Sequence, residues 1–484
     1  MAVSANKTIF LGIFFAITAV VVYRYKDVYQ FYFESPVQIS PVQGIINSWS
    51  NSIKPPLKQF QKLAVGVNSN VDVIVSGVSL LKALDMKPGD KKNNHVLSSV
   101  DELQETFSFY FARGSAAERS FTNPIIYQKI IQTAETISDV EHFIGGNAAL
   151  MAKKASSLFP KLQINFVGPV GPLLESLMPK SVKIPDSCRI PRDEVHLIME
   201  YKVGERWGNL TSPVANRFIT SHDESNAKIV MLEPYFESIK AFQPDLILLS
   251  GLNIMDGQSP KFFQERLNKL VHLLKEVPST VPIHLELASM ANRDFVRLII
   301  DQALPNLDSL GLNEQEIVFS SKALDGPHHD HFDEEHDKQP DIYKISDIML
   351  FILQKYGRSG ANPGSRLTRI HFHSLTYHIV AVDSAAWSNV DVAAAAGTQV
   401  AGLQACNIPK LSEELVRLQI PLKFKLYTGD VEREFDPLNP VISWETSGYH
   451  FVFSPVLVCK HPVKTVGLGD AISATGLMFS QFHS

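Results

Sequence analysis

The sequence predicts an α/β protein built on one large, mainly parallel β-sheet with helices on its faces. Apolar runs of strand length recur along the chain, and amphipathic stretches of helix length separate them. The 484 residues correspond to about three average domains, and a composition with 45% hydrophobic residues excludes a mainly disordered protein. The net charge of −5 provides no basic field that would attract nucleic acid. We therefore expect a folded body with no nucleic-acid partner.

One long apolar run, residues 9–23, lies near the N-terminus, between Lys7 and the pair Arg24 and Lys26. It is short for a membrane-spanning helix, which needs about 20 apolar residues, and it fits the core of a signal peptide or signal-anchor. We expect residues 1–26 to direct the chain into the secretory pathway, as a protein that is secreted or associated with the endoplasmic reticulum. Cleavage, attachment to the membrane through the apolar run, and the side on which the body lies all stay open.

Residues 27–60 contain Pro and Ser with weak periodicity and are expected to form an irregular tether. After them, the predicted strands are residues 63–67, 164–168, 197–199, 245–250, 283–287 and 379–382. The predicted helices are residues 260–276, 292–303 and 345–355. Parallel sheets bind ligands beyond the carboxyl ends of their strands. The functional residues should therefore follow strands.

Two further features allow alternative interpretations. Residues 323–340 are dense in His and acidic residues, which is compatible with a metal-binding tract; a solvated loop is preferred because few apolar residues could anchor a rigid set of ligands. Cys188, Cys406 and Cys459 lack the spacing of metal ligands. An oxidising lumen would permit one disulfide among them, and otherwise all three are buried thiols.

The strongest local motif is Gly467-x-Gly469-Asp470, which precedes an apolar helical stretch. Two glycines allow a tight turn that points several backbone N–H groups at one spot. The start of a helix adds partial positive charge there, which suits a phosphoryl group. Asp470 beside this anion hole can accept a proton from an alcohol. The alternative is an ordinary loop in which Asp470 is only the N-cap of the helix.

Two more carboxylates follow predicted strands. Glu286 ends a buried strand, and Glu316 follows the loop of residues 308–312. Mg²⁺ is usually held by one or two carboxylates, keeps several waters and bridges phosphates, so two acidic strand ends facing one crevice would suit it. The alternatives are a salt-bridged structural residue for Glu286 and a first-turn helix acid for Glu316.

These residues belong to a larger ordered set that spans about 400 residues and resembles one family. The set consists of Asn70-x-Asp72, Gly114 to Glu118, Gly145-Gly146-Asn147, His284-x-Glu286, Asn313-x-x-Glu316 and the Gly467 to Asp470 motif. In this order it resembles the ADP-dependent glucokinases of the animal type, within the ribokinase-like superfamily. The resemblance implies a ribokinase-like fold for residues 61–484, with a smaller lid domain supplied by segments within 72–118 and 193–223.

The resemblance also implies an activity. A member of this family transfers the β-phosphate of ADP to the 6-hydroxyl of D-glucose and releases glucose 6-phosphate and AMP, the step by which glucose enters glycolysis. It uses Mg²⁺ and an aspartate base, and we expect a monomer. ADP as the donor follows from the resemblance alone, because Gly-x-Gly-Asp does not distinguish ADP from ATP. The chain lacks a P-loop motif, so a P-loop mechanism is not supported.

Carried over by position, the resemblance assigns roles to individual residues. Asp470 becomes the catalytic base, and Glu286 and Glu316, with Asp470, organise Mg²⁺ directly or through water. The sugar-facing set is Asn70, Asp72, Glu118, Gly146, Asn147 and His196; the nucleotide-facing set is Arg217, Asn313, Gly467 and Gly469. Read without the family, His196 is a satisfied core histidine and Arg217 a surface salt bridge. The resemblance also implies a disulfide between Cys406 and Cys459.

Rival functions stay open both within the same class of enzyme and in another class of protein. A related phosphofructokinase must admit a sugar phosphate, and an inward-pointing Glu118 would repel that phosphate, so its presence favours an unphosphorylated hexose. A broader hexose kinase is a second possibility within the same class. The rival from another class is a catalytically silent, membrane-tethered protein that binds a nucleotide or a sugar. The complete set of Glu286, Glu316 and Asp470 argues against it.

Overall fold

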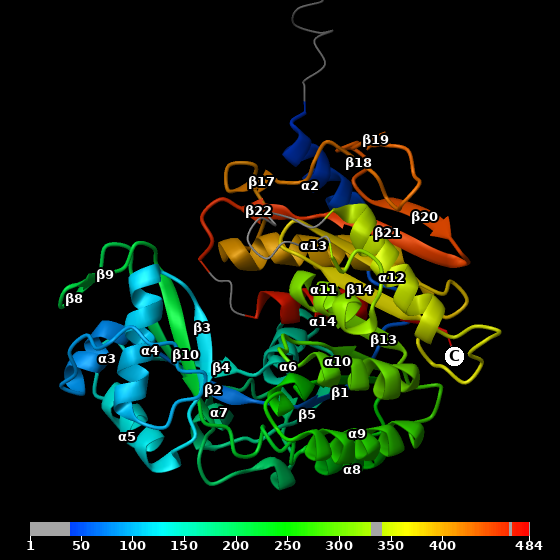
Figure 1. Cartoon of the computed structure of the whole chain (residues 1–484). Helices are drawn as coiled ribbons and strands as arrows, with labels where there is room; N and C mark the ends of the chain where they lie inside the picture. The colour runs from blue at the N-terminus through cyan, green and yellow to red at the C-terminus, as the bar shows by residue number, and fades with distance from the viewer. Residues whose placement is uncertain (1–38, 331–340, 464–466, 484) are drawn as a thin grey trace, which may run out of the picture.

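The computed structural model describes residues 39–330, 341–463 and 467–483, which form two domains of unequal size (Figure 1). The signal or anchor segment and most of the His-rich tract lie outside these residues. Within the described ranges, no helix is both long enough and apolar enough to cross a membrane, and no group of three or more His, Cys, Asp or Glu side chains is arranged to hold a metal ion.

The larger domain contains a ten-stranded sheet in the order β20-β21-β15-β14-β13-β12-β11-β1-β5-β6. Every neighbouring pair from β6 to β14 is parallel, and the pairs from β14 to β20 are antiparallel. The strands are β1 Lys62–Val67, β5 Gln163–Val167, β6 Val182–Lys183, β11 Leu246–Ser250, β12 Ile283–Glu286, β13 Ser309–Leu312, β14 Arg369–His373, β15 Tyr377–Val382, β20 Ile442–Thr446 and β21 Tyr449–Pro455. The predicted large, mainly parallel sheet is confirmed.

Helices cover both faces of this sheet. The middle strands are apolar at almost every position because both of their faces are buried: Leu246 and Leu248 of β11 pack in one core, and Ile247 and Leu249 pack in the other. The helices are α6 Asn147–Leu158, α8 Leu232–Phe242, α9 Pro260–Lys275, α10 Arg293–Leu298, α11 Glu314–Leu324, α12 Ile342–Tyr356, α13 Val390–Cys406 and α14 Leu468–Phe479. The helices α6 and α14 pack against each other and on the sheet.

The smaller domain is built on a separate five-stranded sheet in the order β3-β10-β7-β2-β4. Its strands are β2 Asn70–Ser76, β3 Ala117–Ser120, β4 Glu141–Gly145, β7 Val195–Tyr201 and β10 Asn216–Ser221, and α3 Gly77–Ala83, α4 Val100–Arg113 and α5 Pro124–Ala134 accompany them. Predicted strand 197–199 therefore belongs to this second sheet. The strand β4 lies outside the two segments that we expected to supply a lid. That this domain acts as a lid stays a prediction.

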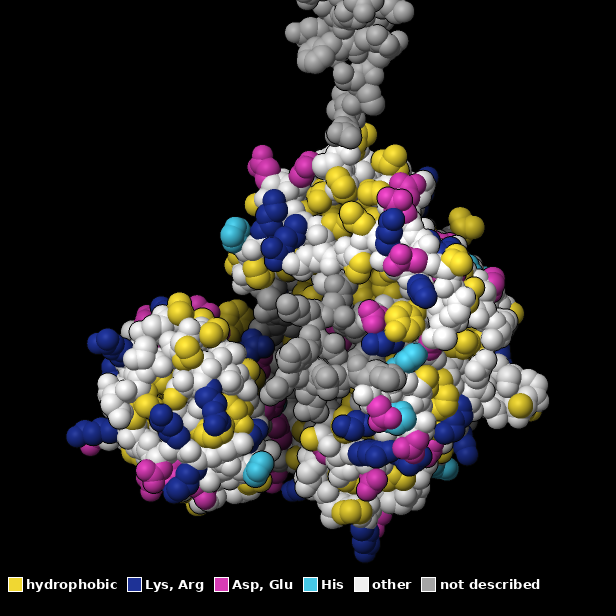
Figure 2. All heavy atoms as spheres, turned by 45° about the horizontal axis from the view of Figure 1, so that its top comes forward, with side chains coloured by type: hydrophobic (Ala, Val, Ile, Leu, Met, Phe, Trp, Pro, Cys, Tyr) yellow, Lys and Arg dark blue, Asp and Glu magenta, His cyan; other side chains and the backbone are white. Residues whose placement is uncertain are grey.

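Shorter elements complete the two domains. They are α7 Pro172–Leu177, β8 Arg206–Trp207, β9 Leu210–Thr211, β16 Trp387–Ser388, β17 Val416–Leu418, β18 Lys423–Phe424, β19 Arg433–Glu434, β22 Leu457–Cys459 and β23 Gln481–Phe482. Figure 2 shows the two domains as separate lobes with a groove between them.

Part of the expected tether is a helix. Residues 41–52 form α2 (Pro41–Ser52), which begins with Ser40 as N-cap and Pro41 in its first turn. Ile45 and Trp49 lie four residues apart on one face of α2 and are fully buried in the core of the larger domain. The folded body therefore begins about 20 residues before the boundary expected at residue 61.

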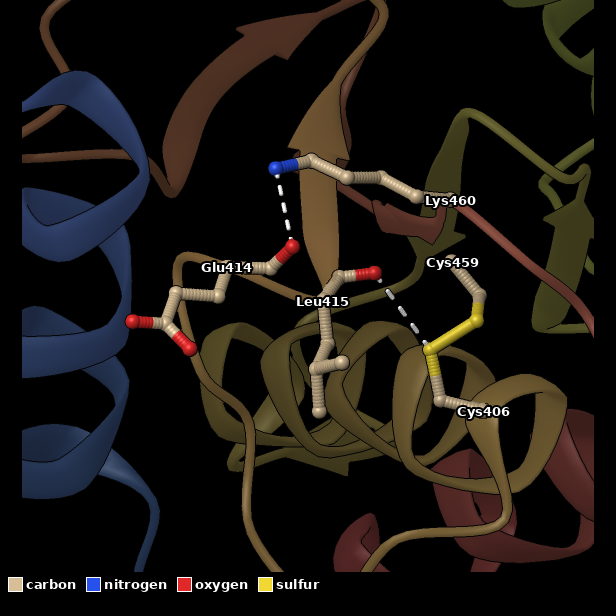
Figure 3. The surroundings of a disulfide bond; sticks show 5 residues. All are labelled: Cys406, Glu414, Leu415, Cys459 and Lys460. Carbon is tan, nitrogen blue, oxygen red and sulfur yellow. Dashed lines mark hydrogen bonds between the residues drawn. A yellow bond between two sulfur atoms is a disulfide. The ribbon is translucent and has the colours of Figure 1, made fainter.

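Cys406 and Cys459 form a disulfide, as the resemblance implied (Figure 3). It joins the last residue of α13 to the last residue of β22. Beside it, the side chain of Lys460 donates hydrogen bonds of 3.1 and 3.0 Å to the backbone carbonyls of Glu413 and Glu414. Cys188 is a buried free thiol. The bridge thus fixes the chain eight residues before Gly467.

Candidate active site

A cavity of about 870 Å³ lies between the two domains, at the carboxyl ends of β1, β11, β12 and β13. This is the position expected for a ligand site on a parallel sheet. The cavity brings together all the residues that the sequence predicted for binding and catalysis. They are Asn70, Asp72, Glu118, Gly146, Asn147, His196, Arg217, Glu286, Asn313, Glu316, Gly467, Gly469 and Asp470.

The start of α14 forms one end of the cavity. Its N-cap is Gly467, whose φ of 66° suits a glycine, and Asp470 lies in the first helical turn. The alternative that Asp470 is itself the N-cap is therefore wrong. Only 7% of Asp470 is exposed. Burial raises the pKa of its carboxyl to about 8, and the charge of Glu286 acts in the same direction. A carboxyl in this setting can take up a proton near neutral pH.

Glu286 ends β12 at the centre of a buried polar network. His373 approaches its Oε1 at 2.8 Å, His284 approaches its Oε2 at 3.1 Å, and the hydroxyl of Ser473 donates to the same Oε2. Burial alone would raise the pKa of Glu286, but the charge of His373 and the hydrogen bonds from both histidines lower it to about 2. Glu286 is therefore an anion at neutral pH. Glu286 is salt-bridged to His373, as the alternative interpretation expected, and it also faces the cavity.

The backbone beside Glu286 leaves no room for a side chain. A Cβ at Gly311 of β13 would lie 1.9 Å from Glu286 Oε2. Gly145 plays the same part at the other end of the cavity, where a Cβ would lie 2.2 Å from both Asn70 Nδ2 and Asp72 Oδ1. Each glycine therefore lets a polar side chain lie flat across a neighbouring strand.

These two glycines allow a paired prediction. We expect Gly311→Ala to lower kcat about 10-fold or more by displacing Glu286, and Gly145→Ala to raise the KM for the substrate that binds beside Asn70 and Asp72 by a similar factor, since a misplaced site group costs on this scale. Steady-state kinetics with both substrates varied will separate the two effects. Gly360→Ala is the matched control, because nothing lies within 4 Å of its Cβ position. If both variants changed kcat and KM to the same extent, the separate roles given to the end that holds Glu286 and the end that holds Asn70 and Asp72 would be contradicted.

Glu316 lies in the first turn of α11, as the alternative reading expected, and forms a capping box with Asn313. Its carboxylate oxygens accept hydrogen bonds from the backbone and side-chain nitrogens of Asn313 at 2.8 and 2.9 Å. Burial raises the pKa of Glu316 to about 8. Asn313 and Glu316 therefore hold the start of the helix, and both also line the cavity.

The smaller sheet supplies the opposite end of the cavity. Asn70 Nδ2 donates to Asp72 Oδ1 at 2.7 Å, and Asp72 and His196 are register neighbours on the parallel strands β2 and β7. Burial raises the pKa of Asp72. Among the described residues, the guanidinium of Arg217 makes no ion pair, so the salt-bridge alternative finds no partner. Its positive charge is thus available to the cavity.

The conserved region of the ADP-specific phosphofructokinase/glucokinase family matches residues 61–479. The chain belongs to this family. It is 43% identical over 448 residues to the ADP-dependent glucokinase of Bos taurus, a match that covers 92% of this chain and 89% of that protein. It is 40% identical to the probable ADP-dependent glucokinase of Caenorhabditis elegans, and this match covers 90% of this chain and 88% of that protein.

A solved structure of the family shares the fold. The crystal structure of a hypothetical ADP-dependent phosphofructokinase from Pyrococcus horikoshii OT3 aligns with a TM-score of 0.63 at 17% identity, over 88% of this chain and 98% of that chain. The fold class predicted from the sequence is therefore that of the family.

Among the cavity residues to which the sequence assigned no role, three make hydrogen bonds that shape the site. Asn68 accepts a hydrogen bond from the backbone N–H of Ala148 at the start of α6, His373 pairs with Glu286, and Asp223 pairs with His196. Asn68 follows a predicted strand, which was a usable signal. For His373 and Asp223, only the folded chain shows which side chains they meet.

Proposed function

We propose that this protein is an ADP-dependent glucokinase that transfers the β-phosphate of ADP to the 6-hydroxyl of D-glucose, giving glucose 6-phosphate and AMP. One observation carries the proposal: buried Asp470, at the start of α14, lies in the same cavity as the sugar-facing polar set on the smaller sheet. The names of the two animal relatives agree with it. This reaction is the step by which glucose enters glycolysis.

The residues of the cavity divide the work of phosphoryl transfer, which depends on positioning and charge neutralisation. Asn70, Asp72, Glu118 and His196 would bind the sugar hydroxyls, since each unpaired buried group costs about 1–3 kcal/mol. The 6-hydroxyl would then face Asp470, which accepts its proton. The backbone N–H groups at Gly467 and Gly469 and the guanidinium of Arg217 would stabilise the negative charge of the transferred group.

The donor set of the cavity fits a hydrated Mg²⁺ ion. The oxygens of Glu286 and Glu316 already accept hydrogen bonds from His284, His373 and Asn313, and no closed cage of three ligands is present in the described part of the chain. Mg²⁺ keeps several waters and bridges phosphates. Glu286 and Glu316 would therefore hold it through water. When bound, the ion neutralises phosphate charge.

A panel of donors and acceptors tests the proposed function. The purified chain is assayed with Mg²⁺ and with ADP, ATP or GDP as donor, against glucose or fructose 6-phosphate as acceptor. We expect glucose 6-phosphate and AMP in equal amounts from ADP and glucose, and little turnover of fructose 6-phosphate. Preference for fructose 6-phosphate would establish the phosphofructokinase alternative instead. Binding of ADP and glucose without turnover would favour the silent binding protein.

The position of Glu118 leads to a prediction on acceptor choice. Glu118 lines the cavity near Asp72 and His196, and its charge acts on both. We expect Glu118→Gln to lower kcat/KM for glucose about 10-fold and to raise the fructose 6-phosphate/glucose ratio, because a negative carboxylate that repels phosphate is lost. Glu141 is exposed on β4 and provides the control, so Glu141→Gln should keep the fructose 6-phosphate/glucose ratio of the parent. An unchanged ratio in Glu118→Gln would contradict this role.

We further propose that the catalytic body lies in the secretory pathway. The apolar run of residues 9–23 supports this, and the bridge between Cys406 and Cys459 suits an oxidising compartment. Asn209 provides a test, since it begins an Asn-x-Thr sequon and is exposed in the turn between β8 and β9. Expression in animal cells followed by endoglycosidase should shift the mass of the parent and leave Asn209→Gln unchanged. A parent without glycan would favour a cytosolic body.

A further inference from the structure

A buried ion pair lies in the wall of the sugar-facing end of the cavity. His196 Nε2 lies 3.1 and 3.0 Å from the two carboxylate oxygens of Asp223. His196 is carried by β7, and Asp223 follows β10 on the neighbouring strand of the smaller sheet. Only 17% of the His196 side chain and 9% of the Asp223 side chain are exposed. Both residues line the cavity.

The pairing leaves one ring nitrogen of His196 for a ligand. Nε2 is committed to Asp223, whereas Nδ1 has no hydrogen-bond partner among residues 39–330, 341–463 and 467–483. Burial alone lowers the pKa of His196, but Asp223, with Glu118 and Asp72, raises it to about 10. His196 is therefore an imidazolium, and its Nδ1–H is a charged donor in a cavity that also presents the Asp72 carboxylate.

Hydrogen bonds from residues outside the His196 pair hold Asp223 and its turn in place. Asn226 Nδ2 donates to Asp223 Oδ1 at 3.3 Å and to the backbone carbonyl of Ser69 at 2.8 Å. The carboxylate of Glu194 accepts hydrogen bonds from three successive backbone N–H groups, those of residues 224–226. The turn that carries Asp223 is thus fixed by buried contacts that do not involve a ligand. Such a network can fix the orientation of a group that faces the site.

We propose that Asp223 is a positioning residue for sugar binding, which acts through His196 by fixing its ring and keeping Nδ1–H directed to a sugar hydroxyl. The proposal rests on the proposed function, because that function assigns the sugar to this end of the cavity. The role of Asp223 differs from that of Asp470, because Asp223 supports binding of the acceptor and does not take part in proton transfer. Its loss should therefore change KM for glucose more than kcat.

Asp223→Asn tests this role with little change in shape. The amide oxygen can still accept from Nε2, but the loss of charge leaves His196 neutral, so that Nδ1 becomes an acceptor. We expect the KM for glucose to rise about 10-fold to 100-fold, with kcat and the KM for ADP changed less than about 3-fold. Asp308→Asn is the matched control, because Asp308 is also buried and ion-paired, with Arg366, but lies outside the cavity. It should keep the parent KM.

A double-mutant cycle shows whether Asp223 acts through His196. In a His196→Gln background, Asp223→Asn should change the KM for glucose by less than about 2-fold. A further 10-fold rise in that background, or an unchanged KM in the single variant, would overturn the proposal. If Asp223→Asn does not fold, Asn226→Ser loosens Asp223 and should raise the KM about 3-fold; an unchanged KM there is equally decisive. A parent without glucose kinase activity would instead refute the proposed function.

Discussion

Asp470→Asn should abolish almost all glucose phosphorylation, with kcat reduced about 10³-fold. A positioned general base contributes about 10²-fold to 10⁴-fold, and Asn cannot accept the proton of the 6-hydroxyl. The change is nearly isosteric, and Asp470 is buried beside Glu286, so we expect thermal stability to be unchanged or higher. Coupled detection of glucose 6-phosphate will measure kcat, and equilibrium titration will measure glucose affinity.

The control for this variant is Asp294→Asn. Asp294 also lies in the first turn of a helix, α10, but it is exposed and outside the cavity. It should keep the parent kcat. Retained glucose affinity in Asp470→Asn, together with lost turnover, would assign Asp470 to the chemical step. Full turnover in Asp470→Asn would refute the mechanism.

Removal of the disulfide should destabilise the protein by about 4 kcal/mol. Cys406 and Cys459 are separated by 53 residues, and closing a loop of this length lowers the entropy of the unfolded chain by an amount equivalent to about 4 kcal/mol. The double variant Cys406→Ala, Cys459→Ala should therefore unfold at lower urea concentration than the parent. Activity at low temperature should persist, because neither sulfur lines the cavity.

The reduced parent provides the matched control. Reductant should lower the unfolding midpoint of the parent to that of the double variant and leave the double variant unchanged. Equal midpoints of the oxidised parent and the double variant would contradict a stabilising bridge.

The sequence predicted the large sheet well and the smaller sheet poorly, for one physical reason. Strands such as β11 are buried on both faces and read as continuous apolar runs. The strand β2 instead alternates Val71, Val73 and Val75 with Asn70 and Asp72, whose side chains serve the cavity. Polar residues in a strand weaken its apolar signal, and a functional site is where this is expected.

The motifs predicted which residues share the site, but their contacts needed the fold. The segment from Gly467 to Asp470 was readable because a Gly-rich helix start has a local signature. The pairs Glu286–His373 and His196–Asp223 join residues 87 and 27 positions apart. No local pattern encodes such a pair. The helix α2 was missed for a different reason. It is only 12 residues long, so its apolar pattern is a weak signal, and it is stabilised mainly by burial of Trp49 in the core of the larger domain.

The order of the strands along the chain determines when each sheet can be completed during synthesis on the ribosome. The strand β10 lies between β3 and β7, so the smaller sheet is incomplete until residue 221 has emerged. The strand β1 must wait for β11, and α14 is nearly the last element made. At about 5–20 residues per second, the roughly 250 residues between β10 and Asp470 take about 10–50 s. Every strand of the smaller sheet, which carries most of the residues proposed to bind the acceptor, is therefore synthesised long before Asp470.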